Sequence, residues 1–179
     1  MAEVFVSVDV ETAGPHPSRY SLLSIGACLL EDRERDFYIE LKPVSLDHTP
    51  EAMQVSGLSM ESLAKTGVDP TEAMQRFSDW LEEVCPEGDT CVFVGFNAAF
   101  DWMFVCEYFW RYLGYNPFGH SAFDIKSYSA AVTDGSWQGT SLRYLSPKYL
   151  NGIQLNHNAL EDAKVQAELF CALRAEITP

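Results

Sequence analysis

The chain has 179 residues, of which 47% are hydrophobic and 21% are charged, and this length and composition indicate a single soluble globular domain over residues 1–179. Its formal net charge of −14 at pH 7 argues against a nucleic-acid partner unless divalent cations reverse the local field. The five cysteines form no CxxC pair, and residues 1–11 contain acids but no basic segment. We therefore expect reduced thiols, no signal peptide and no membrane span, as in a cytoplasmic protein.

The first predicted element is a strand over residues 4–11, in which every second residue is valine, the period of a strand with two distinct faces. The valine face is expected to be buried. The opposite face ends in Asp9 and Glu11, two like charges that repel each other unless a positive group lies between them. The segments 21–30 and 36–42 follow as strands joined by a charged turn, which predicts an antiparallel meander.

Two helices are predicted next. Thr49 is the expected N-cap of the first, which ends before Gly57. The second starts with a capping box formed by Asp69 and Glu72, and its apolar residues recur every three or four positions up to residue 84.

The remainder of the chain is predicted to alternate strands with helices. In order, the patterns indicate a strand covered on both faces over 90–96, an aromatic-rich helix over 97–114, a short strand over 122–125, and helices near 126–133 and 141–145. Asn158 and Glu161 begin a last helix, whose buried stripe is expected to include Leu160, Ala163 and Phe170. This order predicts an α/β fold with a mixed five-stranded sheet flanked by helices.

Two further segments supply acids that could join Asp9 and Glu11. In GFNAAFD, Asp101 lies just past the end of a buried strand, at the start of a helix. In HNALEDA, Asp162 lies in the first turn of the last helix, and His157 precedes its N-cap. Hard cations such as Mg²⁺ and Mn²⁺ prefer carboxylate oxygens, and the segments contain neither cysteine nor paired histidines, which argues against structural zinc.

Together, VDVET, FNAAFD and HNALED resemble the three exonuclease motifs of the DEDD superfamily, in the DEDDh branch that has a histidine five residues before the last aspartate. The resemblance covers about residues 4–171. VDVETAG and NPFGHSAFD are most similar to ribonuclease T and related bacterial 3′–5′ exonucleases, although Phe96 stands where many relatives have histidine. The resemblance implies a ribonuclease H-like fold with the carboxylates gathered at one end of the sheet.

The activity implied by this resemblance is metal-dependent 3′–5′ exonuclease hydrolysis of phosphodiester bonds at the 3′ ends of single-stranded DNA or RNA, with release of nucleoside 5′-monophosphates. Two Mg²⁺ or Mn²⁺ ions would supply the positive charge missing beside Asp9 and Glu11. By position in the motifs, Asp9, Glu11 and Asp162 would hold the catalytic ion, Asp101 would act on the second ion, and His157 would be the general base.

Substrate contacts are expected from residues near the motifs. Thr12 and Ala13 directly follow Glu11 and could meet the terminal nucleotide through backbone groups, and ribonuclease T-like enzymes imply contacts from Glu51 and Val55. The remaining candidates are aromatic residues that could stack on bases, an asparagine, and cations in a segment poor in acids: Phe96, Phe100, Trp102, Phe123, Asn97, Arg111, Lys126, Arg143 and Lys148. Asp124 is expected to cap or pair locally.

Three alternatives stand beside this prediction: a non-catalytic nucleic-acid-binding module on the same fold, an RNA-trimming enzyme of the ribonuclease T type, and a structure-selective endonuclease. The presence of all five motif residues argues against the first, and the FNxxFD and HxxxxD arrangements argue against the last. No residue in the sequence is identified as a reader of the ribose 2′-hydroxyl, so DNA and RNA are not distinguished. Because ribonuclease T-type relatives act as dimers, the resemblance also implies a homodimer.

Overall fold

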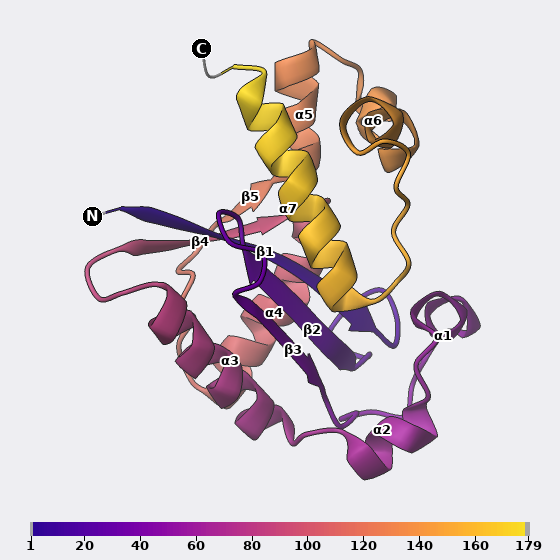
Figure 1. Cartoon of the computed structure of the whole chain (residues 1–179). Coiled ribbons are helices and arrows are strands. Elements are labelled where there is room, and N and C mark those ends of the chain that lie inside the picture. Colours follow the sequence, from indigo (N-terminus) through magenta and orange to yellow (C-terminus); the bar gives the residue numbers. More distant parts are fainter. Residues whose placement is uncertain (1, 178–179) are drawn as a thin grey trace.

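The computed structural model describes residues 2–177, in which five strands form one sheet of order β3-β2-β1-β4-β5 (Figure 1). The strands are β1 (Glu3–Thr12), β2 (Leu22–Leu29), β3 (Asp36–Glu40), β4 (Thr90–Gly95) and β5 (Ala122–Asp124). β1, β2 and β3 pair antiparallel, whereas β4 runs parallel to both β1 and β5. The predicted meander and the predicted mixed five-stranded sheet are confirmed.

Seven α-helices and one 3₁₀ helix occur in the described residues. They are α1 (Pro50–Ser56), α2 (Met60–Thr66), α3 (Pro70–Val84), α4 (Ala98–Tyr112), α5 (Ile125–Thr133), η1 (Trp137–Thr140), α6 (Leu142–Tyr149) and α7 (Ala159–Ala175). The sequence did not predict α2, because only Leu63 is buried in this two-turn helix and no apolar stripe is present. Nor did it predict η1. Helix α6 is longer than expected and continues past Pro147 to Tyr149. No helix of residues 2–177 combines the length and apolarity that crossing a membrane requires.

Two local expectations need correction. Asp69 caps α3 by accepting a hydrogen bond from the Thr71 N–H at 2.9 Å, but Glu72 pairs with Arg76 one turn later instead of completing a capping box. In α7, Leu160 is half-buried, and Ala159 occupies the buried position of that turn. The first difference arises because the Glu72 carboxylate has a cationic partner on its own helix.

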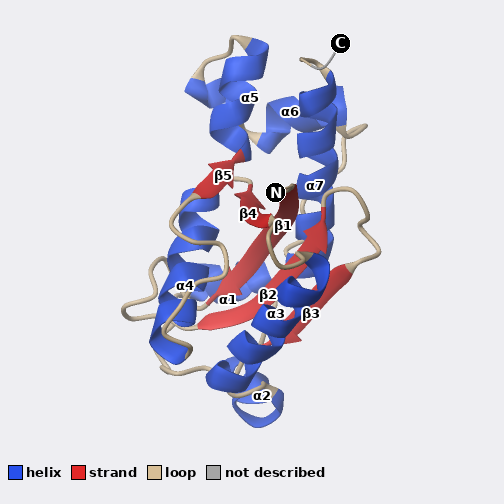
Figure 2. Ribbon diagram, turned by 90° about the vertical axis from the view of Figure 1, so that its left-hand side faces the viewer, coloured by secondary structure: helices blue, strands red, loops and turns tan. Residues whose placement is uncertain are grey.

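Helices cover both faces of the sheet (Figures 1 and 2). The valine face of β1 packs in the core formed with α3 and α4, where Val6, Val8 and Val10 are all buried. Helix α7 crosses the other face over β1 and β2, and the Ser7 Oγ donates to the Ala163 carbonyl oxygen at 2.8 Å. The acidic face of β1 is therefore partly covered by α7, with Glu11 buried and Asp9 half-buried.

Gly26 allows α7 to approach the sheet closely. It pairs with Asp9 across β1 and β2, so both residues face the same side of the sheet. A Cβ built at Gly26 would lie 2.1 Å from the Ala159 carbonyl carbon and 2.2 Å from the Leu160 nitrogen. Since these atoms are backbone, they cannot move without displacing the first turn of α7, which contains Asp162.

We predict that Gly26→Ala lowers the free energy of unfolding by about 1–3 kcal/mol, the usual cost of overpacking, because the methyl group displaces the start of α7. Chemical denaturation of the purified protein measures this change. Gly139→Ala is the matched control, because its added Cβ would lie no closer than 3.8 Å to Ser136 Oγ. Equal stability of the two variants would show that the close contact at Gly26 is unimportant.

Candidate active site

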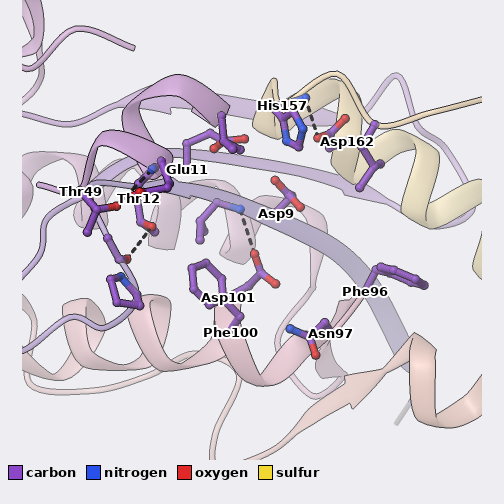
Figure 3. Close-up of a pocket in the computed structure, with 17 residues that line it drawn as sticks. Asp9, Glu11, Thr12, Thr49, Phe96, Asn97, Phe100, Asp101, His157 and Asp162 are labelled. Carbon is purple, nitrogen blue, oxygen red and sulfur yellow. Dashed lines mark hydrogen bonds between the residues drawn. The ribbon is translucent and has the colours of Figure 1, made fainter. Parts of the chain in front are cut away.

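The acidic side chains of the three sequence motifs line one cavity of about 480 Å³ (Figure 3). Asp9 and Glu11 enter it from the end of β1, Asp101 from the first turn of α4, and Asp162 from the first turn of α7. His157 joins them from the loop that precedes α7. The structure thus brings together all five residues that the motifs contribute.

Asp101 is held by the backbone of the strand that contains the first two acids. Its side chain is only 5% exposed, and its Oδ1 accepts a hydrogen bond from the Val10 N–H at 3.1 Å. Asn97 precedes α4 with a φ of 67°, a left-handed conformation that asparagine adopts more readily than most residues. This sharp turn between β4 and α4 directs Asp101 toward β1.

Asp162 is fixed by the loop that carries His157. Its two carboxylate oxygens accept hydrogen bonds from the N–H groups of Asn156 and His157, both at 3.0 Å. His157 has a φ of 61°, an uncommon conformation for a residue with a side chain. The same turn leaves the imidazole exposed, and Figure 3 shows it directed toward the carboxylates.

Glu11, His157 and Asp162 form the tightest group in the site. One ligand atom from each lies within 4.8 Å of the others. Glu11 and Asp162 are buried, whereas His157 is exposed at the mouth of the cavity. The geometry provides a candidate site for a divalent cation, and its donors are mainly the carboxylate oxygens that hard cations prefer.

Asp9 is oriented by Gln166, a residue that the sequence did not single out. The Gln166 Nε2 donates to Asp9 Oδ1, and its Oε1 accepts from the Phe96 N–H at 2.8 Å. Gln166 is 2% exposed and lies one helical turn after Asp162. The sequence contains one signal that could have indicated this role. Gln166 is a polar residue within the buried stripe of α7, and buried amides require hydrogen-bond partners.

Burial disfavours the ionised forms of the four carboxyl groups, and mutual repulsion adds to this effect for Asp9 and Glu11. Burial raises the pKa of Glu11 to about 8, and the charges of Asp162 and Asp101 add to this effect. Burial also raises the pKa of Asp101 to about 7, against the hydrogen bond from Val10. The pKa values of Asp9 and Asp162 are raised as well, chiefly by burial. A bound cation would offset this cost, so the donor set fits a divalent metal.

The structure places most of the predicted substrate-contacting residues on the cavity wall. Six of the seven line it, namely Thr12, Glu51, Val55, Phe96, Asn97 and Phe100. Ala13 does not: its side chain is buried, its N–H donates to the Ser21 carbonyl, and its carbonyl accepts from the Thr49 N–H. Gly14 and Pro15, which the sequence did not indicate, line the cavity in that segment.

The four expected cations do not form one strip. Arg111 lines a separate surface pocket with Arg19 and Asp47. The Lys148 Nζ forms an ion pair with Glu176 Oε1 at 3.1 Å. Of the four, Lys126 contacts the cavity wall, with its Nζ 5.9 Å from the Phe96 ring centroid.

The other local expectations fall into two groups. The aromatic rings of Trp102 and Phe123 pack against Phe93 and Phe170, respectively, as core residues. Asp124 acts locally as expected: it caps α5 and also accepts from the Ala98 N–H.

We predict that the metal-free protein loses stability as pH rises from about 4, the ordinary carboxyl value, through the raised pKa values of about 7 and 8. Stability falls with rising pH because the folded state binds these protons more tightly than the unfolded state does. Mn²⁺ should therefore raise the thermal midpoint more at pH 8 than at pH 5. Differential scanning fluorimetry with and without a chelator measures both effects.

Glu11→Gln provides the matched variant, because it removes one charge without changing the shape of the side chain. At pH 8 it should raise the midpoint of the metal-free protein and reduce the shift caused by Mn²⁺. A pH-independent midpoint and an unchanged Mn²⁺ shift would contradict the electrostatic account.

Comparisons with known proteins agree with this geometry. The family model RNase_T, described as Exonuclease, matches residues 6–170. The 3′-5′ DNA exonuclease Cap18 of Escherichia coli is 50% identical over 168 residues, which cover 94% of this chain and 90% of that protein.

Solved structures share the fold. The nuclease domain of 3′hExo, a DEDDh family member bound to rAMP, aligns with a TM-score of 0.75 at 15% identity and covers 96% of this chain and 90% of that one. Exonuclease I of E. coli, in complex with a 5cy-dT13 oligonucleotide, aligns with a TM-score of 0.70 at 20% identity, and this chain spans 40% of its length. The predicted ribonuclease H-like fold is confirmed. With the RNase_T model matched over most of the sequence and a 50% identical exonuclease, the chain belongs to this exonuclease family, and all five of its DEDDh-like motif residues line one cavity.

Proposed function

We propose that this enzyme is a divalent-metal-dependent 3′–5′ exonuclease that removes nucleoside 5′-monophosphates from the 3′ ends of single-stranded DNA. The observation that carries the proposal is the cavity in which Glu11, His157 and Asp162 approach within 4.8 Å, beside Asp9 and Asp101. DNA is favoured as the substrate by the name of the 50% identical E. coli exonuclease and by the oligonucleotide in the exonuclease I complex.

The acidic residues have separate tasks in this proposal. Asp9, Glu11 and Asp162 would hold one cation and Asp101 a second, and when bound these ions would supply positive charge that neutralises the reacting phosphate. Asp162 keeps a fixed orientation because two backbone N–H groups hold its oxygens. The Val10 N–H holds one oxygen of Asp101 in the same way, and the Gln166 side chain holds one oxygen of Asp9. The site is thus preorganised by hydrogen bonds that do not depend on substrate.

His157 would accept the proton of the attacking water. A general base needs its neutral form and a position within hydrogen-bond reach of the water. The imidazole lies in the same group as Glu11 and Asp162, and it is exposed at the cavity mouth, where solvent enters. Its backbone N–H donates to Asp162, which fixes the backbone from which the imidazole extends.

The cavity is of a size that suits one nucleotide. Its volume of about 480 Å³ lies in the range of small-molecule sites. In Figure 3, Thr49 and Phe96 lie at opposite sides of the cavity, with Phe100 and Thr12 between them. We assign the terminal nucleotide to the part of the cavity near α1, where Thr12, Glu51 and Val55 form the wall.

The direct test uses single-stranded DNA and RNA labelled at the 5′ end, incubated with Mg²⁺ or Mn²⁺. We expect a ladder of products shortened one nucleotide at a time from the 3′ end of the DNA. Asp101→Asn should keep the fold, because Val10 can still donate to the side-chain oxygen, and should lose activity by at least about 100-fold.

The outcomes of this test distinguish the alternatives. Cleavage of RNA alone would support an RNA-trimming enzyme of the ribonuclease T type, consistent with the name of the family model. Internal cuts alone would defeat the exonuclease assignment. Binding of the strands without cleavage would support a non-catalytic module.

A second prediction concerns the orientation of Asp9. Gln166→Leu removes the hydrogen bond to Asp9 and should weaken Mn²⁺ binding roughly 10-fold or more, the usual effect of removing a group that orients a ligand. Isothermal titration calorimetry measures this independently of activity. Glu168→Leu, on the same helix but outside the cavity, is the control. Unchanged Mn²⁺ affinity of Gln166→Leu would exclude an orienting role.

A further inference from the structure

An exposed tryptophan lies next to the cavity wall. Trp137, in η1, is 60% exposed, and the Lys126 Nζ lies 4.4 Å from its ring centroid. The same Nζ is 5.9 Å from the ring of Phe96, which lines the cavity. These three side chains therefore form a continuous surface, here called the 96–126–137 surface, that leads out of the site.

This surface contains a cation in a strongly acidic protein. Lys126 is the charged residue of the three, whereas the chain as a whole has a net charge of −14. Within residues 2–177, Lys126 and Arg143 form no ion pair with a carboxylate. The ammonium group of Lys126 can therefore meet a phosphate group without first breaking an ion pair.

Packing does not account for Trp137. Its side chain is absent from the hydrophobic clusters formed by the described residues. An exposed indole beside a cation is the combination found where proteins bind single strands, because the ring stacks on any base and the cation meets the phosphate.

We propose that the 96–126–137 surface binds the nucleotides on the 5′ side of the scissile bond, with a base stacked on Trp137 and a phosphate on Lys126. The inference rests on the proposed function, because it assumes that the 3′-terminal nucleotide occupies the cavity. Stacking on an aromatic face tolerates every base, so this surface gives affinity without sequence preference.

The test compares two DNA substrates. One is a single strand about ten nucleotides long, and the other is the p-nitrophenyl ester of thymidine 5′-monophosphate, which has no nucleotide on the 5′ side of its scissile bond. Trp137→Ala should lower kcat/KM for the strand roughly 5- to 100-fold, because stacking on one aromatic ring contributes that much, and should leave kcat/KM for the ester unchanged. Trp137→Phe should retain most of the activity on the strand.

Trp110→Ala is the matched control, because Trp110 is 49% exposed on α4 and does not line the cavity. Lys126→Gln should weaken cleavage of the strand and reduce its dependence on salt concentration. Normal activity of Trp137→Ala on the strand, or an equal loss on both substrates, would overturn the proposal.

A binding measurement separates this inference from the proposed function. Fluorescence anisotropy of a labelled strand with the metal-free protein should show weaker binding by Trp137→Ala than by wild type. If wild type hydrolyses neither substrate but the variant still binds less tightly, the surface is supported and the proposed activity fails. If wild type cleaves the strand and the variant binds it equally well, the surface is refuted and the activity stands.

Discussion

The structure depends on the contact that holds the start of α7 against the sheet at Gly26. Because Gly26 has no Cβ, the first turn of the helix rests directly on β2, next to the position of Asp9 on β1. This contact brings Asp162, from the end of the chain, into the same cavity as the acids of β1. Without it, the acids near residues 9 and 162 would belong to separate surfaces, and neither group alone could surround a cation.

The same contact has an electrostatic cost. Four carboxyl groups are gathered in one cavity, and the pKa of each is raised, by burial first and then by repulsion for Asp9 and Glu11. The fold maintains this arrangement through hydrogen bonds from Val10, Asn156, His157 and Gln166 and through the packing of both sheet faces. An electrostatic cost of this kind is expected at a functional site, because a bound cation relieves it and the site therefore binds cations more strongly.

Much of this arrangement could be predicted from the sequence, because the relevant signals are local. The alternation in residues 4–11 indicated a strand with two acids at its end, and the caps at Thr49 and Asn158 gave the starts of α1 and α7. The spacing of FNAAFD and HNALED then placed Asp101 and Asp162 in first turns of helices, as the structure shows.

What the sequence did not reveal depends on tertiary contacts. Gln166 was not singled out, because its role depends on the fold placing its amide between Asp9 and Phe96. Four cations in one acid-poor segment suggested a strip, yet Arg111 lines a separate pocket and Lys148 pairs with Glu176. Ala13 directly follows Glu11, but its N–H and carbonyl are hydrogen-bonded to Ser21 and Thr49.

The central claim is that side chains from three distant segments hold divalent cations in one cavity. Anomalous X-ray diffraction from a crystal soaked in Mn²⁺ tests it most directly. The account predicts an anomalous peak among the carboxylate oxygens of Asp9, Glu11 and Asp162, at a coordination distance of about 2.0–2.3 Å. A fully soaked crystal with no peak in the cavity, or with Mn²⁺ bound only elsewhere on the surface, would contradict it.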